Sequence, residues 1–139
     1  MTELLDKYFE HRQLTTPSKE SYEGLARAYA AWYQKFLPKD KNARILDVGC
    51  GTGGFLFFLE KQGYTNYWGI DLCATQVKYI QEHITPRVTV ADGFEYLKAN
   101  GRFNVVVLND TLEHVPKNRV LDFLTSINKA LEPKGLLFI

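Results

Sequence analysis

A carboxylate and a group of glycines are placed close together in the first half of the chain. They are Asp47, Gly49, Gly51, Gly53 and Gly54. Glycine permits positive φ angles and lets a ligand approach the backbone without meeting a Cβ atom. Apolar residues flank the group on both sides, which predicts a buried strand, a turn and a helix whose free N–H groups point at the turn. A nucleotide-like ligand is the first hypothesis for such a turn.

Two interpretations of these glycines differ in the charge of the ligand. Gly49, Gly51 and Gly54 fit the dinucleotide fingerprint of nicotinamide-dependent oxidoreductases. Asp47 favours another ligand, because a carboxylate at the end of the strand suits an ammonium group and opposes a pyrophosphate. We therefore favour a positively charged nucleoside and keep the nicotinamide cofactor as the alternative.

A second acidic residue follows at the distance expected for a nucleoside site. Asp71 closes the expected strand at residues 67–71 and lies 18 residues beyond Gly53. In this architecture an acidic residue about 20 residues beyond the turn contacts the ribose hydroxyls. The alternative is that Asp71 caps the helix that begins near Cys73. Leu72 comes next and is placed to flank an adenine ring.

The loop at residues 109–116 is the candidate for the reacting end of the site. It follows residues 103–108, whose continuous apolar character predicts a central strand buried on both faces. Ligands bind beyond the carboxyl ends of such strands, so Asn109 is expected beside the glycine turn. His114 is the only histidine expected at this end of the sheet and is the candidate general base. The alternative is that Glu113 and His114 organise the loop or cap the next helix.

The first 42 residues are expected to form a helical segment that contributes a lid or substrate contacts. Residues 2–12 predict a short amphipathic helix, and Thr16 and Pro17 suit the cap and first turn of a second helix that continues to Phe36. Its apolar stripe has a spacing of three and four residues, which is typical of a buried helix face. Core packing is the expected role for most of its aromatic residues, and the alternative is that Tyr29 and Tyr33 help to cover the ligand. Tyr8 and Tyr22 are the candidates for substrate or lid contacts.

The segment from about residue 43 to the end resembles the class I S-adenosylmethionine-dependent methyltransferases. The resemblance rests on Asp47 with its glycines, on Asp71, on Asp92 and on the loop at residues 109–116. The loop is similar to that of small-molecule methyltransferases of the ubiquinone and menaquinone biosynthesis type and of sugar methyltransferases. The loop has no N/D-P-P-Y/F motif and the chain has no prolyl-cysteine nucleophile, which argues against methylation of DNA bases.

The resemblance implies S-adenosyl-L-methionine as cofactor and S-adenosyl-L-homocysteine as product. It also assigns a hydrogen bond from the adenine amine to Asp92, although Asp92 can equally cap the short helix that follows. The cofactor-binding residues expected on these grounds are Asp47, Gly49, Cys50, Gly51, Gly53, Asp71, Leu72, Asp92, Gly93 and Asn109.

Strands alternating with helices predict an α/β fold with a Rossmann-like, doubly wound and mostly parallel sheet. The expected strands are residues 45–48, 67–71, 87–91, 103–108 and 136–139. The cofactor-binding domain is expected at residues 43–139 and to be truncated after the fifth strand. That strand is then an exposed apolar edge through which two copies can associate.

Composition limits the remaining choices. The chain has 139 residues, enough for one domain, and its net charge of +1 gives no reason to expect a nucleic-acid or membrane partner. Its two cysteines lack the partners of a metal site, and a reduced cytoplasmic compartment is expected. The sequence thus predicts methyl transfer to a small molecule, most simply at a hydroxyl. The alternatives are a nicotinamide-dependent oxidoreductase and a cofactor-binding regulatory domain without turnover.

Overall fold

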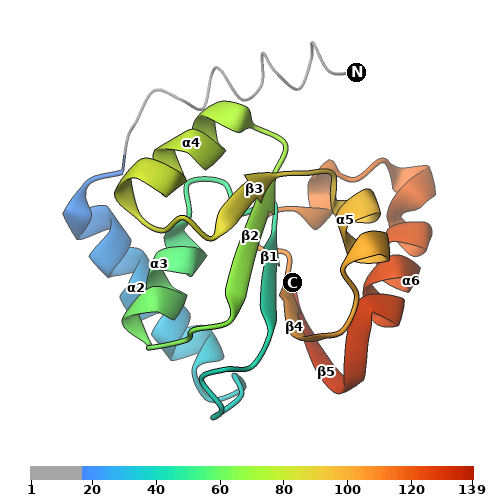
Figure 1. The fold of residues 1–139 in the computed structure, drawn as a ribbon, viewed down its shortest axis with the longest axis horizontal. Coiled ribbons are helices and arrows are strands. Elements are labelled where there is room, and N and C mark those ends of the chain that lie inside the picture. Colours follow the sequence, from blue (N-terminus) through green and yellow to red (C-terminus); the bar gives the residue numbers. More distant parts are fainter. Residues whose placement is uncertain (1–16) are drawn as a thin grey trace.

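A parallel sheet forms the centre of the computed structural model, which describes residues 17–139 (Figure 1). The order of its five strands is β3-β2-β1-β4-β5. Their bounds are Ile45–Val48 for β1, Tyr67–Asp71 for β2, Val88–Val90 for β3, Phe103–Val107 for β4 and Leu131–Phe138 for β5. Tyr8 and the helix predicted at residues 2–12 lie outside the described residues. The strand order reverses between β1 and β4, where folds of this class bind their ligands.

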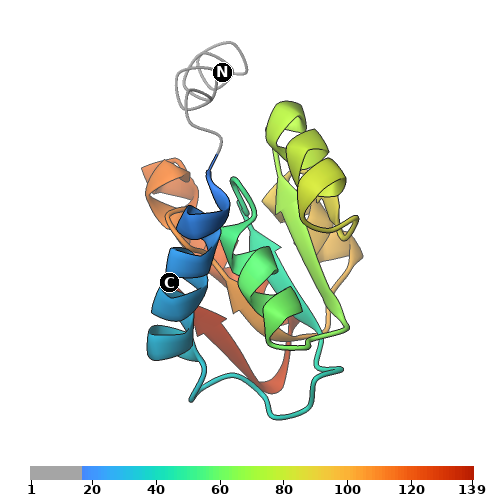
Figure 2. The same cartoon turned by 90° about the vertical axis from the view of Figure 1, so that its left-hand side faces the viewer.

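Helices cover both faces of the sheet (Figures 1 and 2). One face carries α2 (Lys19–Tyr33), α3 (Gly54–Lys61) and α4 (Ala74–His83). The other face carries α5 (Gly93–Ala99) and α6 (Val120–Ala130). The predicted doubly wound, parallel α/β fold is therefore confirmed.

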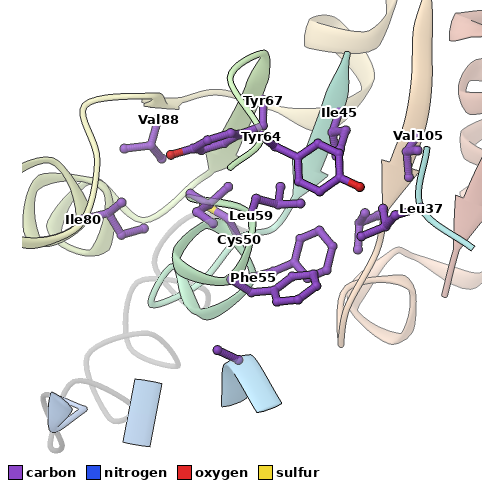
Figure 3. Close-up of a cluster of buried hydrophobic side chains, with 14 of the residues drawn as sticks. Leu37, Ile45, Cys50, Phe55, Leu59, Tyr64, Tyr67, Ile80, Val88 and Val105 are labelled. Carbon is purple, nitrogen blue, oxygen red and sulfur yellow. The ribbon is translucent and has the colours of Figure 1, made fainter. Parts of the chain in front are cut away.

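Strand β1 is buried along its whole length because it faces a hydrophobic cluster on each side. Ile45 packs with Phe55 and Leu59 of α3 in the first cluster (Figure 3). Leu46, its neighbour in the strand, points to the opposite face and packs in the second cluster. This double burial holds the carboxyl end of β1, and the glycine turn beyond it, in a fixed position.

The bounds predicted for α2 are wrong at both ends. The helix begins at Lys19, and its cap is Ser18, whose hydroxyl accepts a hydrogen bond from the Ser21 N–H at 3.2 Å. Thr16 was the expected cap, but the serine lies three residues before an N–H that its side chain reaches. At the other end Phe36 and Leu37 donate their N–H groups to the Tyr33 carbonyl, so the chain turns there instead of continuing as helix.

The last strand also differs from the prediction, and an irregular turn precedes the last helix. Residues 117–119 form a 3₁₀ turn after Pro116, and α6 begins only at Val120. The strand expected at residues 136–139 begins earlier, at Leu131, and its pairing with β4 shifts register between Phe103 and Val105. Lys134 has a positive φ of 65°, so the strand accommodates an irregular backbone conformation at this residue. Strand β5 lies at the edge of the sheet, and its expected role in self-association stays a prediction.

Candidate functional site

A cavity of about 400 Å³ lies at the carboxyl ends of β1 and β4. Its walls come from α2, the glycine turn, the start of α3, α4 and the loop after β4. Five of the cofactor residues expected from sequence line it, namely Asp47, Gly49, Cys50, Gly51 and Asn109. The walls are thus assembled from segments far apart in the sequence, as the fold predicts.

The glycine turn requires glycine for two different reasons. Gly49 has a φ of 73°, and a Cβ atom there would lie 2.4 Å from the Thr111 Oγ1 atom of the neighbouring loop. Gly51 has a φ of 54°, but a Cβ atom there would meet nothing within 4 Å. Gly49 therefore permits close packing of the glycine turn against the loop that contains Thr111, whereas Gly51 leaves open space for a ligand. Gly53, with a φ of 81°, begins α3 as its N-cap.

Asp47 is a buried carboxylate that lacks a complete set of partners. Its side chain is 2% exposed, and its Oδ1 atom has no hydrogen-bond partner in the structure. Burial, and then the nearby Asp71 carboxylate, raise the pKa of Asp47 to about 8. No lysine, arginine or histidine is among the cavity-lining residues of the described chain. A positively charged ligand would compensate this carboxylate, and a pyrophosphate would oppose it.

Asp71 joins the glycine turn to the loop that follows β2. Its Oδ2 atom accepts the Gly51 N–H at 2.8 Å, and its Oδ1 atom accepts the Cys73 N–H at 2.8 Å. Burial raises the pKa of Asp71, while these backbone hydrogen bonds lower it. The carboxylate thus fixes the conformation of the turn. Its contact with a ribose stays a prediction.

The other residues assigned to the adenosine half of the site do not line the cavity. Leu72 is exposed, and Asp92 caps α5 by accepting the Glu95 N–H at 3.1 Å. A Cβ atom at Gly93 would lie 3.1 Å from Val48 Cγ1, so this glycine allows α5 to pack against the end of β1. Asp92 therefore acts as a helix cap, which was the alternative role, and its contact with adenine stays a prediction.

Helix α2 supplies to the cavity a tyrosine other than the one preferred from sequence. Tyr29 lines the cavity beside Leu25 and Phe55. Tyr22, the expected lid residue, is buried, and its hydroxyl donates to the Thr52 carbonyl at 2.7 Å. Tyr22 thus supports the glycine turn from behind. Tyr22, Leu25 and Tyr29 share the apolar stripe of α2, and only the docking of the helix decides which of them reaches the cavity.

The loop after β4 is attached to the glycine turn. The Thr111 hydroxyl donates to the Val48 carbonyl at 2.8 Å, and the exposed Asp110 adopts a positive φ of 51°. His114 ends the 3₁₀ turn at Leu112–His114 and is exposed at the same end of the sheet, outside the cavity lining. Thr111 is a residue that sequence reasoning missed, because its contact depends on the spacing of β1 and β4.

Comparison with known proteins identifies the family. A family model described as a methyltransferase domain matches residues 21–139. The chain belongs to this methyltransferase family. It is 28% identical over 134 residues to a putative methyltransferase, YqeM, of Bacillus subtilis, with 84% of this chain and 53% of that protein covered.

Solved structures share the fold. One is a SAM-dependent methyltransferase from Archaeoglobus fulgidus, with a TM-score of 0.71 at 24% identity, covering 84% of this chain and 51% of that one. Another, from Bacteroides fragilis, is in complex with S-adenosyl-L-homocysteine and has a TM-score of 0.63 at 17% identity, covering 81% of this chain and 44% of that one.

These matches support S-adenosylmethionine as the cofactor and do not favour the nicotinamide alternative. The methyltransferase family and the fold class expected from sequence are therefore confirmed. The chain spans about half the length of the relatives described above. Within residues 17–139 no helix combines the length and the apolar character needed to cross a membrane.

Proposed function

We propose that this methyltransferase chain binds S-adenosylmethionine in the cavity at β1 and β4 and transfers its methyl group to a hydroxyl of a small molecule. The observation that carries the proposal is the buried Asp47 carboxylate, with its unpartnered Oδ1 atom, in a cavity wall that has no cationic side chain among the described residues. S-adenosylmethionine, when bound, supplies a methyl group on positively charged sulfur.

The chain's own residues contribute positioning and exclusion of water. Gly51 leaves open space at the turn, where a side chain would block a ligand. Phe55 and Tyr29 form an apolar wall of the cavity. Methyl transfer from sulfur is a displacement whose rate depends on aligning nucleophile, carbon and leaving group, so a rigid pocket of this kind supplies most of what the reaction requires.

A hydroxyl acceptor must also lose its proton as the new bond forms. We assign this step to His114, which lies three residues beyond Thr111 in the loop that borders the site. The alternatives are that His114 only organises the loop and that the chain binds the cofactor without turnover. A cytoplasmic location and the absence of a nucleic-acid partner remain part of the proposal.

Radiolabelled methyl transfer tests the proposal. A panel of small hydroxyl compounds, amines and a peptide substrate is offered with labelled S-adenosylmethionine. We expect label in a hydroxyl compound, and we expect His114→Ala to reduce that rate by about 100-fold, as for loss of a general base. His83→Ala, at an exposed histidine on α4, is the matched control and should keep the full rate.

Three outcomes would contradict parts of this proposal. Label found only in amines or only in the peptide would overturn the hydroxyl assignment. A near-normal rate of the His114→Ala variant would remove His114 from the chemistry. Cofactor binding without transfer to any acceptor would favour the regulatory alternative.

A further inference from the structure

A tyrosine of α2 is hydrogen-bonded to the loop after β4. The Tyr33 hydroxyl donates to the Asn109 Oδ1 atom at 2.7 Å, across 76 residues of sequence. The contact joins the first helix of the described chain to the cavity wall, because Asn109 lines the cavity.

The ring of Tyr33 is held on several sides. It stacks on Phe138 of β5, with ring centres 4.9 Å apart and an angle of 8° between the planes. It also stacks on Tyr29, with ring centres 6.0 Å apart. With Phe55 of α3 it forms an edge-to-face contact, with ring centres 5.7 Å apart. Figure 2 shows how α2 lies over the part of the sheet that contains β5. Packing therefore fixes the ring, and with it the position of the hydroxyl.

This hydrogen bond decides which end of the Asn109 amide remains available. A carboxamide has an oxygen that accepts and a nitrogen that donates. The oxygen is used by Tyr33, while the Nδ2 atom is buried without a partner. Burial, with the carboxylates of Asp110 and Asp47, raises the pKa of Tyr33, so its hydroxyl keeps the proton that it donates.

Three buried polar atoms of the cavity lining then lack a hydrogen-bond partner among the described residues, one donor and two acceptors. The donor is Asn109 Nδ2, and the acceptors are Asp47 Oδ1 and Gln76 Oε1. Buried groups of this kind cost free energy until a ligand pairs with them. An amino-acid group pairs with two of them, its carboxylate with Asn109 Nδ2 and its ammonium with Asp47 Oδ1.

We propose that Tyr33 is a positioning residue, which orients the Asn109 amide so that its N–H group binds the carboxylate at the amino-acid end of the cofactor. Asp47 takes the ammonium group of the same ligand. The inference rests on the proposed function and adds to it a residue outside the predicted domain at residues 43–139.

The test compares two ligands that differ only in the amino-acid end. S-adenosylhomocysteine carries it, and 5′-methylthioadenosine has a methyl group in its place. Calorimetry measures both affinities for the wild-type chain, Tyr33→Phe, Asn109→Ala and the double variant. We expect Tyr33→Phe to weaken the affinity for S-adenosylhomocysteine about tenfold, because a hydrogen bond to a charged group loses its support. The affinity for methylthioadenosine should change by less than about twofold.

The double variant separates positioning from packing. If Tyr33 acts through Asn109, adding Tyr33→Phe to Asn109→Ala produces no further loss. Asn109→Asp keeps the acceptor for Tyr33 but replaces the donor with a charged oxygen, and we expect it to lose S-adenosylhomocysteine most severely. Tyr64→Phe is the matched control, because Tyr64 donates to the Pro38 carbonyl at 2.7 Å and does not line the cavity.

Equal weakening of both ligands by Tyr33→Phe, or additive losses in the double variant, would overturn the inference and leave the proposed function intact. A wild-type chain that binds neither ligand would overturn both. The melting temperature of the Tyr33→Phe variant, measured without ligand, shows whether this variant is folded. If it is unfolded, the affinities of the Asn109→Asp variant for S-adenosylhomocysteine and methylthioadenosine are compared instead.

Discussion

Asp47 connects the chemistry of the site to the stability of the fold. A carboxylate at this depth has its pKa raised to about 8 by burial and by Asp71, whereas in an unfolded chain it titrates near about 4. Between these values the folded protein holds a proton that the unfolded chain has released. Stability therefore decreases as pH rises through this window.

The first prediction follows from this decrease of stability with rising pH. Without ligand, the free energy of unfolding of the wild-type chain should fall between about pH 5 and 8, and Asp47→Asn should remove most of that fall, since each pKa unit is worth about 1.4 kcal/mol. Chemical denaturation at several pH values measures it. Asp122→Asn changes an exposed carboxylate of α6 and is the control. If the stability of the wild-type chain does not decrease as pH rises, the claim that Asp47 is buried without a compensating partner is wrong.

At the scale of elements, the glycine turn has separate structural and ligand-binding requirements. Gly51 and Gly63 both have positive φ angles, of 54° and 80°, and a Cβ atom would meet nothing within 4 Å at either. They differ in position, because Gly51 lines the cavity and Gly63 follows the end of α3.

Replacing each of these glycines with alanine is the second prediction. Both variants should lose about 1 kcal/mol of stability from the left-handed backbone. Only Gly51→Ala should also weaken binding of S-adenosylhomocysteine, because its methyl group enters the space reserved for the ligand. Equal ligand affinities of the two variants would show that the ligand does not approach the turn at Gly51.

Sequence predicted the elements that depend on local patterns. The apolar run of β1, its glycines and the acid at the end of β2 are short-range signals, and all lie where they were expected. The hydrogen bond between Tyr33 and Asn109 depends instead on how α2 docks, which no spacing encodes. The same holds for Tyr29, which lines the cavity although Tyr22 was preferred. The cap at Ser18 was missed because Thr16 fits the same preference.

At the scale of the whole molecule, α2 belongs to the hydrophobic core. Tyr22 and Ala26 are each 5% exposed, and Ala26 packs in the cluster that contains Phe55 and Ile45. The helix also supplies Tyr29 to the cavity. Ligand binding and folding should therefore both depend on its docking.

A pair of variants in α2 gives the third prediction. Ala26→Asp places a charge in the core and should destabilise the whole chain by more than about 2 kcal/mol, in one cooperative transition. Ala31→Asp is the matched control on the exposed side of the same helix, and its effect should stay within about 0.5 kcal/mol. An Ala26→Asp variant that loses α2 while the rest melts unchanged would show that the helix is an independent unit.

Direct titration of the wild-type chain tests the central claim, that this cavity is built for a cationic nucleoside. Calorimetry with S-adenosylmethionine, S-adenosylhomocysteine and NAD should show one site for each of the first two. The affinity for NAD should be at least about 100-fold weaker, because an ammonium group stabilises the ionised form of Asp47 and a pyrophosphate disfavours it. Binding of NAD as tight as that of S-adenosylmethionine, or no binding of S-adenosylmethionine and S-adenosylhomocysteine, would contradict the account.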